Sequence, residues 1–356
     1  MYSWKTVLVT IGLLFTLKIW NPYFVENISW SWFDYLHSTH SVQEYNPESG
    51  LPEIVLVDID EKSVEQYGQL PFPRKIYADK MLESHWSNTY VFTQVFSEPD
   101  RFGGDEEFAT ALVNRLSILS SAPTIQTDKG SSPFVGTSTL GSGDAKNAVW
   151  GTPGVLSPIP ILEGNTYGVG VTTATPSQSG TPNFDGTIRS APLLMQANGQ
   201  IYPSLAVEVL RAYNDEKSYQ MKVTEEVGVE WVRVGRQKPI STTPQGDLMI
   251  SYWNKFKRYS FTDELPENSI LVFGVTAEGL NNPVSTPMGT MYPHEVQANL
   301  IQTALTGIQI KQSYFLEFVE VVLLLAVLVI VLVMVYKLPT ALSGSFSLIL
   351  LSLIHI

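Results

Sequence analysis

Acidic residues follow the ends of two predicted strands. Asp58 and Asp60 lie at the carboxyl end of the apolar run 54–59, and Glu98 and Asp100 follow the next strand along the chain. Parallel strands end at one edge of a sheet, where α/β folds hold their ligands. Two interpretations stay open. The acids either cap helices and brace loops, as the position of Asp60 favours, or they form a ligand or cation site.

Arg74 stands at the predicted start of a helix, where a positive charge opposes the helix dipole. Its presence against this local preference indicates a specific partner. The side chain either pairs with Asp58, Asp60 or Asp100 as a buried brace, or it presents its guanidinium to an anionic ligand.

Asp185 lies in a predicted turn at 184–187 and Arg189 follows it, and they allow the same two interpretations. Their side chains either pair within the domain or contact a ligand. The candidate ligand-binding residues of the chain are therefore Asp58, Asp60, Arg74, Glu98, Asp100, Asp185 and Arg189.

The sequence lacks the usual motifs of catalysis. His37 and His40 have a spacing seen in metal sites, but no third ligand is near them. His294 beside Glu295 suits a helix start better than acid–base chemistry. The chain contains no P-loop and no Gly-x-Ser-x-Gly elbow. We therefore predict no catalytic residue, no metal and no cofactor, and we do not expect the chain as given to be an enzyme.

Composition narrows the choice of compartment and partner. The chain has no cysteine and a formal net charge of −12 over 356 residues. Absence of thiols suits an oxidising compartment, and an acidic surface keeps a domain soluble. A nucleic-acid partner is not expected, because phosphate binding needs clustered Lys and Arg and the sequence has no such cluster.

The first half of the polar region alternates strands and helices. Apolar runs predict strands at 54–59, 89–96 and 117–121, and helical spacing predicts helices at 77–86 and 105–116. A run that is apolar on both faces is typical of a parallel strand. The alternation predicts an α/β domain with a mixed, largely parallel sheet joined by right-handed crossovers.

The second half is less regular. Residues 123–182 are rich in Gly, Ser, Thr and Pro, and we expect long loops there with a strand only at 169–173. A strand at 188–196 leads to Asn198-Gly199, a hairpin signal. The other predicted elements are a helix from about 204 to 213, strands at 229–234 and 248–252 as antiparallel partners, a buried strand at 270–275 and a helix at 292–305.

Three apolar segments frame the polar region, at residues 4–20, 315–336 and 340–356. We predict that all three cross a membrane, the first as an uncleaved signal anchor because no cleavage site follows it. Lys5 and Lys337 favour the cytoplasmic side at the ends of these spans. Residues 22–314 would then form one extracytoplasmic domain.

Five runs of the polar region stand in an order that resembles the CHASE2 sensor domain over roughly residues 30–307. They are Ile54-Val55-Leu56-Val57-Asp58-Ile59-Asp60-Glu61, Pro71-Phe72-Pro73-Arg74, Phe96-Ser97-Glu98-Pro99-Asp100, Phe184-Asp185-Gly186-Thr187-Ile188-Arg189-Ser190-Ala191-Pro192-Leu193 and Glu295-Val296-Gln297-Ala298-Asn299. The resemblance implies an extracytoplasmic input module of a multi-pass receptor in the bacterial inner membrane. Such modules regulate a cytoplasmic nucleotide cyclase, diguanylate cyclase or histidine kinase.

The chain departs from that pattern because it stops inside the second membrane helix after the sensor, so we expect a fragment without its output domain. The expected partners are the lipid bilayer, an unidentified small-molecule or environmental signal, and a second copy of the chain. Two other functions stay open. One is an anchored periplasmic hydrolase that uses Asp58, Asp60 and Asp100 around a divalent ion, and the other is a structural subunit of a membrane complex.

Overall fold

The computed structural model describes residues 23–308, apart from 127–132, 134 and 174–184, together with residues 310, 322 and 326. The chain divides into two compact units, one of residues 1–40 with 311–356 and one of residues 41–310.

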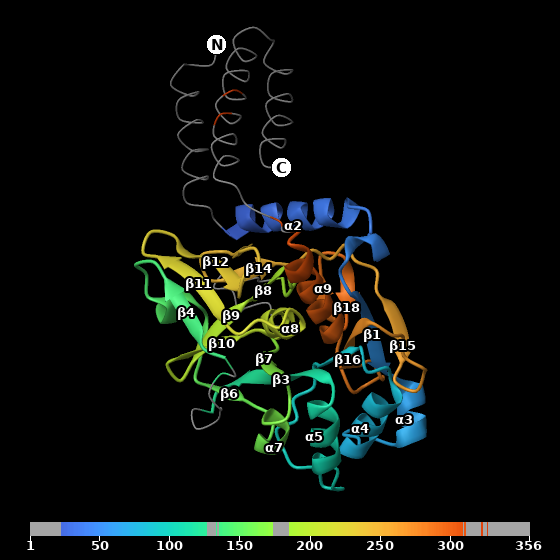
Figure 1. Cartoon of the computed structure of the whole chain (residues 1–356). Helices are drawn as coiled ribbons and strands as arrows, with labels where there is room; N and C mark the ends of the chain where they lie inside the picture. Colours follow the sequence, from blue (N-terminus) through green and yellow to red (C-terminus); the bar gives the residue numbers. More distant parts are fainter. Residues whose placement is uncertain are drawn as a thin grey trace, which may run out of the picture. The chain divides into compact units, whose positions relative to one another are not determined.

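The first unit contains helix α2 (Tyr23–Thr39), drawn in blue in Figure 1. The predicted spans at 4–20, 315–336 and 340–356 lie outside the described residues, apart from residues 322 and 326. Within the part of the chain that the structure describes, no helix has both the length and the apolar character needed to cross a membrane.

The second unit is built on a seven-stranded sheet with the order β15-β1-β16-β2-β3-β6, in which β7 also pairs with β3. Its pairings are parallel except for the antiparallel β3–β6 pair. The predicted mixed, largely parallel α/β fold is therefore confirmed. The strands are β1 (Glu53–Ile59), β2 (Thr89–Phe92), β3 (Leu116–Thr124), β6 (Gly154–Leu156), β7 (Gly168–Val171), β15 (Lys257–Ser260) and β16 (Ser269–Val275).

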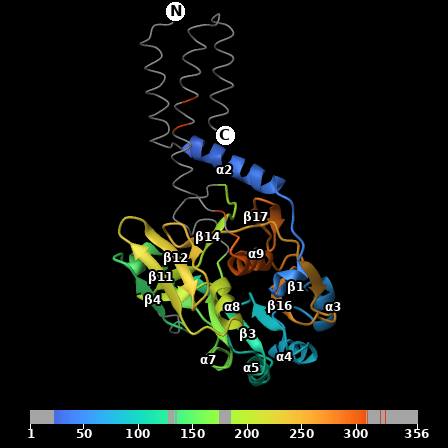
Figure 2. The ribbon, with the colours of Figure 1, turned by 45° about the horizontal axis from the view of Figure 1, so that its top comes forward.

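Helices cover both faces of this sheet (Figures 1 and 2). One face carries α3 (Glu61–Tyr67), α4 (Arg74–Glu83) and α5 (Asp105–Val113). The other face carries α8 (Leu205–Tyr213) and α9 (Pro293–Thr306). This arrangement explains the unbroken apolar sequence of the central strands, since neither of their faces reaches solvent.

Strand β1 shows how the sequence pattern produces these two layers. Ile54 and Leu56 pack with α8 and α9, whereas Val55, Val57 and Ile59 pack with α4 and α5. All five side chains are at most 3% exposed. Burial of each such side chain contributes roughly 1.5–3 kcal/mol, so the central strands anchor the domain.

Smaller sheets complete the second unit. Those among the described residues have the orders β13-β12-β11-β4, β10-β9-β5, β14-β8 and β17-β18. Their strands are β4 (Thr137–Leu140), β5 (Gly151–Thr152), β8 (Ser190–Pro192), β9 (Leu194–Ala197), β10 (Gln200–Pro203), β11 (Tyr219–Thr224), β12 (Gly228–Val234), β13 (Ile240–Ser241), β14 (Asp247–Met249), β17 (Val284–Thr286) and β18 (Gly289–Met291). Short helices lie at η1 (Pro47–Ser49), α6 (Ala145–Ala148) and α7 (Pro160–Glu163).

Two predictions for this part of the chain are wrong and two are confirmed. The expected loop region before residue 174 contains β4 to β6, α6 and α7, whereas β7 confirms the strand predicted at 169–173. The strands predicted at 229–234 and 248–252 do not pair, because β12 pairs with β11 and β13 while β14 pairs with β8. Asn198-Gly199 does form the β9–β10 hairpin, with φ angles of 49° and 75° that are typical of a type I′ turn.

Candidate functional site

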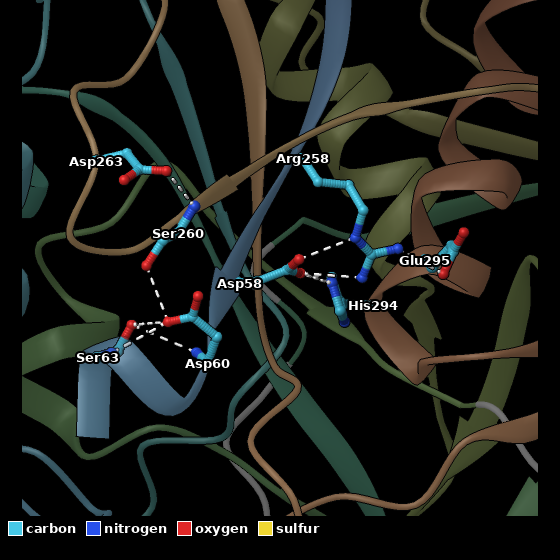
Figure 3. Close-up of polar contacts among 8 residues, drawn as sticks. All are labelled: Asp58, Asp60, Ser63, Arg258, Ser260, Asp263, His294 and Glu295. Carbon is cyan, nitrogen blue, oxygen red and sulfur yellow. Dashed lines mark hydrogen bonds and ion pairs between the residues drawn. The ribbon is translucent and has the colours of Figure 1, made fainter. Parts of the chain in front are cut away.

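The carboxyl end of β1 carries an ionic cluster centred on Asp58 (Figure 3). Arg258 of β15 donates Nε–H to Asp58 Oδ2 at 2.9 Å and Nη2–H to Oδ1 at 3.2 Å. His294 of α9 places Nε2 2.8 Å from the same Oδ1. Asp58 therefore joins the edge strand β15, the central strand β1 and the last helix of the domain.

Glycine at position 274 lets α9 approach the sheet. Gly274 of β16 lies beside Asp58 in the strand register, and a Cβ atom at this position would collide with the ring of His294. The His294 side chain is completely buried, with 0% exposed. Close approach of helix and strand thus sets the hydrogen bond between His294 and Asp58.

Hydrogen bonding also fixes the tautomer of His294. Its Nδ1 atom is buried and has no partner among the described residues. A proton on Nδ1 would leave a buried donor unsatisfied, which costs about 1–3 kcal/mol. We therefore assign the neutral ring with its proton on Nε2, donated to Asp58.

Arg258 holds two carboxylates at once. Its Nη1 atom lies 2.9 Å from Glu295 Oε2, in the first turn of α9. Burial alone would raise the pKa of Asp58, but the hydrogen bonds from His294 and Arg258 hold it below the ordinary value. Burial likewise opposes the charge of Arg258, yet Asp58 and Glu295 raise its pKa. Asp58 and Arg258 therefore stay ionised at neutral pH, and their contacts with His294 and Glu295 hold the first turn of α9 against β1 and β15.

Asp60 has the capping role that its position favoured. Its carboxylate accepts the Ser63 backbone N–H at 3.1 Å, and the Ser63 hydroxyl bonds back to the Asp60 backbone N–H, which makes a capping box for α3. Ser260 Oγ of β15 donates to the same carboxylate at 2.8 Å. Burial would raise the pKa of Asp60, but these bonds lower it. The cap is confirmed, and ligand binding by Asp60 stays a prediction.

Arg74 forms a brace, although with a partner that the sequence did not indicate. Its Nη1 atom pairs with Asp105 at 2.9 Å, and Nη2 donates to the backbone carbonyl of Glu98 at 2.5 Å. Asp100 accepts the backbone N–H of Arg74 at 2.7 Å instead of its guanidinium. Arg74 is 8% exposed and stacks over the Phe96 ring.

Asp185 and Arg189 pair with each other. Arg189 Nη2 lies 2.5 Å from Asp185 Oδ2, and Thr187 donates its backbone N–H to Oδ1 of the same carboxylate. Arg189 is buried, whereas Asp185 is half exposed. Burial raises the pKa of Asp185, but the bonds from Arg189 and Thr187 bring it below its usual value.

The seven predicted site residues therefore fall into three groups, each with its own internal partners. Asp58 and Asp60 share the end of β1, while Arg74, Glu98 and Asp100 form a second group and Asp185 with Arg189 a third. The sequence did not identify Arg258 and Asp105 as partners. Binding of a ligand by any of the seven stays a prediction.

The placement of the acidic side chains bears on cation binding. Among the residues that the structure describes, no three His, Asp or Glu side chains are arranged to hold a metal ion. The acids of the hydrolase hypothesis, Asp58, Asp60 and Asp100, instead accept hydrogen bonds from Arg258, Ser63 and the Arg74 backbone.

Fold and site together define an α/β domain with helices on both faces of its sheet, and an ionic cluster fastens its last described helix to one edge of that sheet. The model of the CHASE2 domain family matches residues 6–336, and the chain belongs to this family. CHASE2 domains are extracellular sensory domains, which fits a sensory, non-catalytic role. Comparisons with curated proteins and with solved structures gave no match.

Proposed function

We propose that this chain is the extracytoplasmic input part of a bacterial transmembrane receptor. Residues 22–314 lie outside the inner membrane, and the segments 4–20, 315–336 and 340–356 cross it. The signal regulates a cytoplasmic cyclase or histidine kinase. Family membership supports the sensory role, and the apolar segments and the lack of cysteine support the location.

The observation that carries the proposal is the attachment of α9 through Asp58. Helix α9 is the last long element of the described domain, and residues 307–314 separate it from the apolar segment 315–336. His294 and Glu295 fix its first turn to β1 and β15. A shift of α9 relative to the sheet is therefore the route by which the domain acts on the segment that follows.

A signal moves α9 only when it binds two arrangements of the domain with different affinity. A coupling of 1–3 kcal/mol is typical between two sites in a protein. The Asp58 cluster supplies a contact of this order, since hydrogen bonds to charged groups contribute about 1.5–3 kcal/mol. A pair of such domains in a homodimer transmits the shift as a reorientation of its two α9 helices.

The location is tested by labelling single cysteines, because the parent chain has none. Trp86→Cys places a thiol at a side chain that is 71% exposed, and Lys337→Cys lies between the two last spans. In cells with a permeable outer membrane, a membrane-impermeant maleimide should label Trp86→Cys at once and Lys337→Cys only after the inner membrane is opened. Protection of Trp86→Cys until that step would refute the proposed orientation, and the cysteine-free parent controls for background.

A further inference from the structure

A pocket of about 340 Å³ opens at the edge of the sheet opposite to Asp58. Thr89 and Ser269, the first residues of β2 and β16, line it, as does Pro52 just before β1. These strands are neighbours in the sheet. Strand β1 has seven residues, so the pocket and the Asp58 cluster lie roughly 20 Å apart along the strands. The volume is in the range of small-molecule sites.

Among the described residues that line the pocket, none is an aspartate, glutamate, lysine, arginine or histidine. A charged ligand would lose hydration there and find no opposite charge, which is costly. The rings of Tyr45 and Tyr213 stand at the pocket and are 37% and 39% exposed. Tyrosine offers an apolar face together with a hydroxyl, so the wall suits a neutral molecule that has both C–H faces and hydroxyl groups.

Thr89 contributes a hydroxyl to the pocket. The residue lines the pocket and is 3% exposed. A hydroxyl both donates and accepts hydrogen bonds, so a ligand that occupies the pocket can bond to Thr89 in either sense.

The floor around Thr89 is preorganised by hydrogen bonds between the segments at the starts of β2 and β16. Asn268 donates its backbone N–H to Ser87 Oγ at 3.2 Å, and Ser269 donates to Asn88 Oδ1 at 3.0 Å. Asn88 in turn donates to the Pro266 carbonyl at 2.7 Å. These contacts hold the lining in place before a ligand arrives, which lowers the entropic cost of binding.

We infer that this pocket binds a neutral, polyhydroxylated small molecule of about monosaccharide size, held by the Thr89 hydroxyl and the Tyr45 and Tyr213 rings. The part of this inference that makes the ligand the signal rests on the proposed function.

The rim of the pocket leads to α9. Gln43, in the segment that carries Tyr45, accepts the Lys255 N–H at 3.0 Å. The neighbouring Asn254 donates to Asn299 Oδ1 at 3.4 Å, and Ser251 donates its N–H to Thr303 Oγ1 at 3.0 Å. A ligand that orders residues 43–52 therefore acts on the second half of α9 through this series of hydrogen bonds.

Binding is tested with the full chain in detergent by saturation-transfer difference NMR. The probes are neutral hexoses and disaccharides, each compared with its uronic acid as the matched charged compound. We expect a signal from a neutral sugar and none from the uronic acid. The inference is overturned if no neutral sugar gives a signal at millimolar concentration. It is also overturned if adenosine gives a signal and none of the sugar probes does.

Variants locate the site. Thr89→Val removes one hydroxyl and should weaken sugar binding about five-fold, the loss expected for one hydrogen bond. Tyr213→Ser, at a partly exposed position, is a second variant that keeps the core intact and should weaken binding at least as much. Thr110→Val, on the exposed side of α5, is the matched control. Equal affinity in both pocket variants and the parent overturns the assignment.

Hydrogen exchange separates the pocket from its role as a sensor. Sugar binding should slow amide exchange in residues 41–52 and change it in α9. Binding that leaves α9 unchanged supports the pocket but refutes its part in signalling. The cysteine-labelling result tests the orientation of the domain independently of either outcome.

Discussion

Arg74 is at the start of a helix, a position where the helix dipole alone disfavours a positive charge. Two carboxylates from outside α4 compensate for this position. Asp100 accepts the backbone N–H of Arg74, where Pro73 provides no cap, and Asp105 pairs with the guanidinium. Burial lowers the pKa of Arg74 while Asp105 and Asp100 raise it in part. Loss of the Arg74 guanidinium would therefore leave buried hydrogen-bond acceptors without a donor.

Removal of this charge is expected to destabilise the domain strongly. Arg74→Ala leaves Asp105 and the Glu98 carbonyl without their donor, and loss of one partner from a buried pair costs about 3–5 kcal/mol. Lys75→Ala is the control in the same helix, because the Lys75–Asp79 pair is exposed and such pairs contribute less than about 1 kcal/mol. Urea unfolding measures both. Similar losses in the two variants would contradict the assignment of Arg74 as a brace.

Asp247 is a second buried ionisable group, but its carboxyl has no partner among the described residues. The residue is 1% exposed, and neither carboxylate oxygen has a hydrogen-bond partner among the described residues. Burial raises its pKa from 3.8 to about 7. The folded domain therefore binds this proton more tightly than the unfolded chain does. Stability is greatest with Asp247 protonated and falls as the pH rises from the unfolded to the folded pKa.

Asp247→Asn should remove this pH dependence, since the amide is neutral at every pH. The parent is expected to lose about 2–3 kcal/mol more than the variant between about pH 5 and pH 8, because each pKa unit corresponds to about 1.4 kcal/mol. The free energy of unfolding at both pH values gives this difference. Asp79→Asn, at an exposed position, should keep the slope of the parent. An Asp247→Asn variant that also keeps it would show that Asp247 is ionised in the folded domain.

At the scale of elements, the sequence predicted those whose periodicity is strong. Apolar runs of five or more residues identified β1 and β16, and helical spacing identified α5, α8 and α9 to within a few residues. Apart from the strand expected at 169–173, the region before residue 174 was mistaken for loops, because β4, β5 and β6 are two to four residues long and rich in Gly and Thr. Such short strands contain too few residues to show alternation.

The candidate site was predictable only where its contacts are local. The cap of Asp60 on α3 follows from residues three positions apart. Arg258 pairs with Asp58 across 200 positions of sequence. This contact depends on the β15–β1 pairing, and the local sequence around either residue gives no sign of it. The Arg74 partner was missed for a related reason, since α4 and α5 had to be packed together before Asp105 could be preferred over Asp100.

Packing of α9 on β16 depends on the missing side chain at position 274. Gly274→Ala introduces a methyl group into the ring of His294, so we expect His294 to move from Asp58 and the domain to lose about 1–3 kcal/mol. Gly136→Ala is the control, because a Cβ there meets nothing within 4 Å. Thermal unfolding reports the stability, and nitrogen shifts of His294 report its hydrogen bond. Unchanged shifts would refute this account of the helix–strand contact.

In the domain as a whole, α9 links features at opposite edges of the sheet. Its first turn joins the Asp58 cluster, and its later residues Asn299 and Thr303 contact the segment beside the rim of the pocket. Helix α9 also packs along β1 and β16 between these ends. Because α9 is held at two places, a change at either contact can alter its position. A switching element requires two such alternative arrangements.

Release of one of these contacts should free α9 without unfolding the domain. Asp58→Asn keeps the shape of the side chain but removes the charge shared by Arg258 and His294, at a cost of about 1.5–3 kcal/mol. We expect faster amide exchange in the first turns of α9, measured by mass spectrometry, with little change in β2 and β3. Glu53→Gln is the matched control on the same strand, because its partner Lys257 is exposed. If α9 exchanged at the parent rate in Asp58→Asn, the cluster would not control the helix, and signalling through α9 would need another origin.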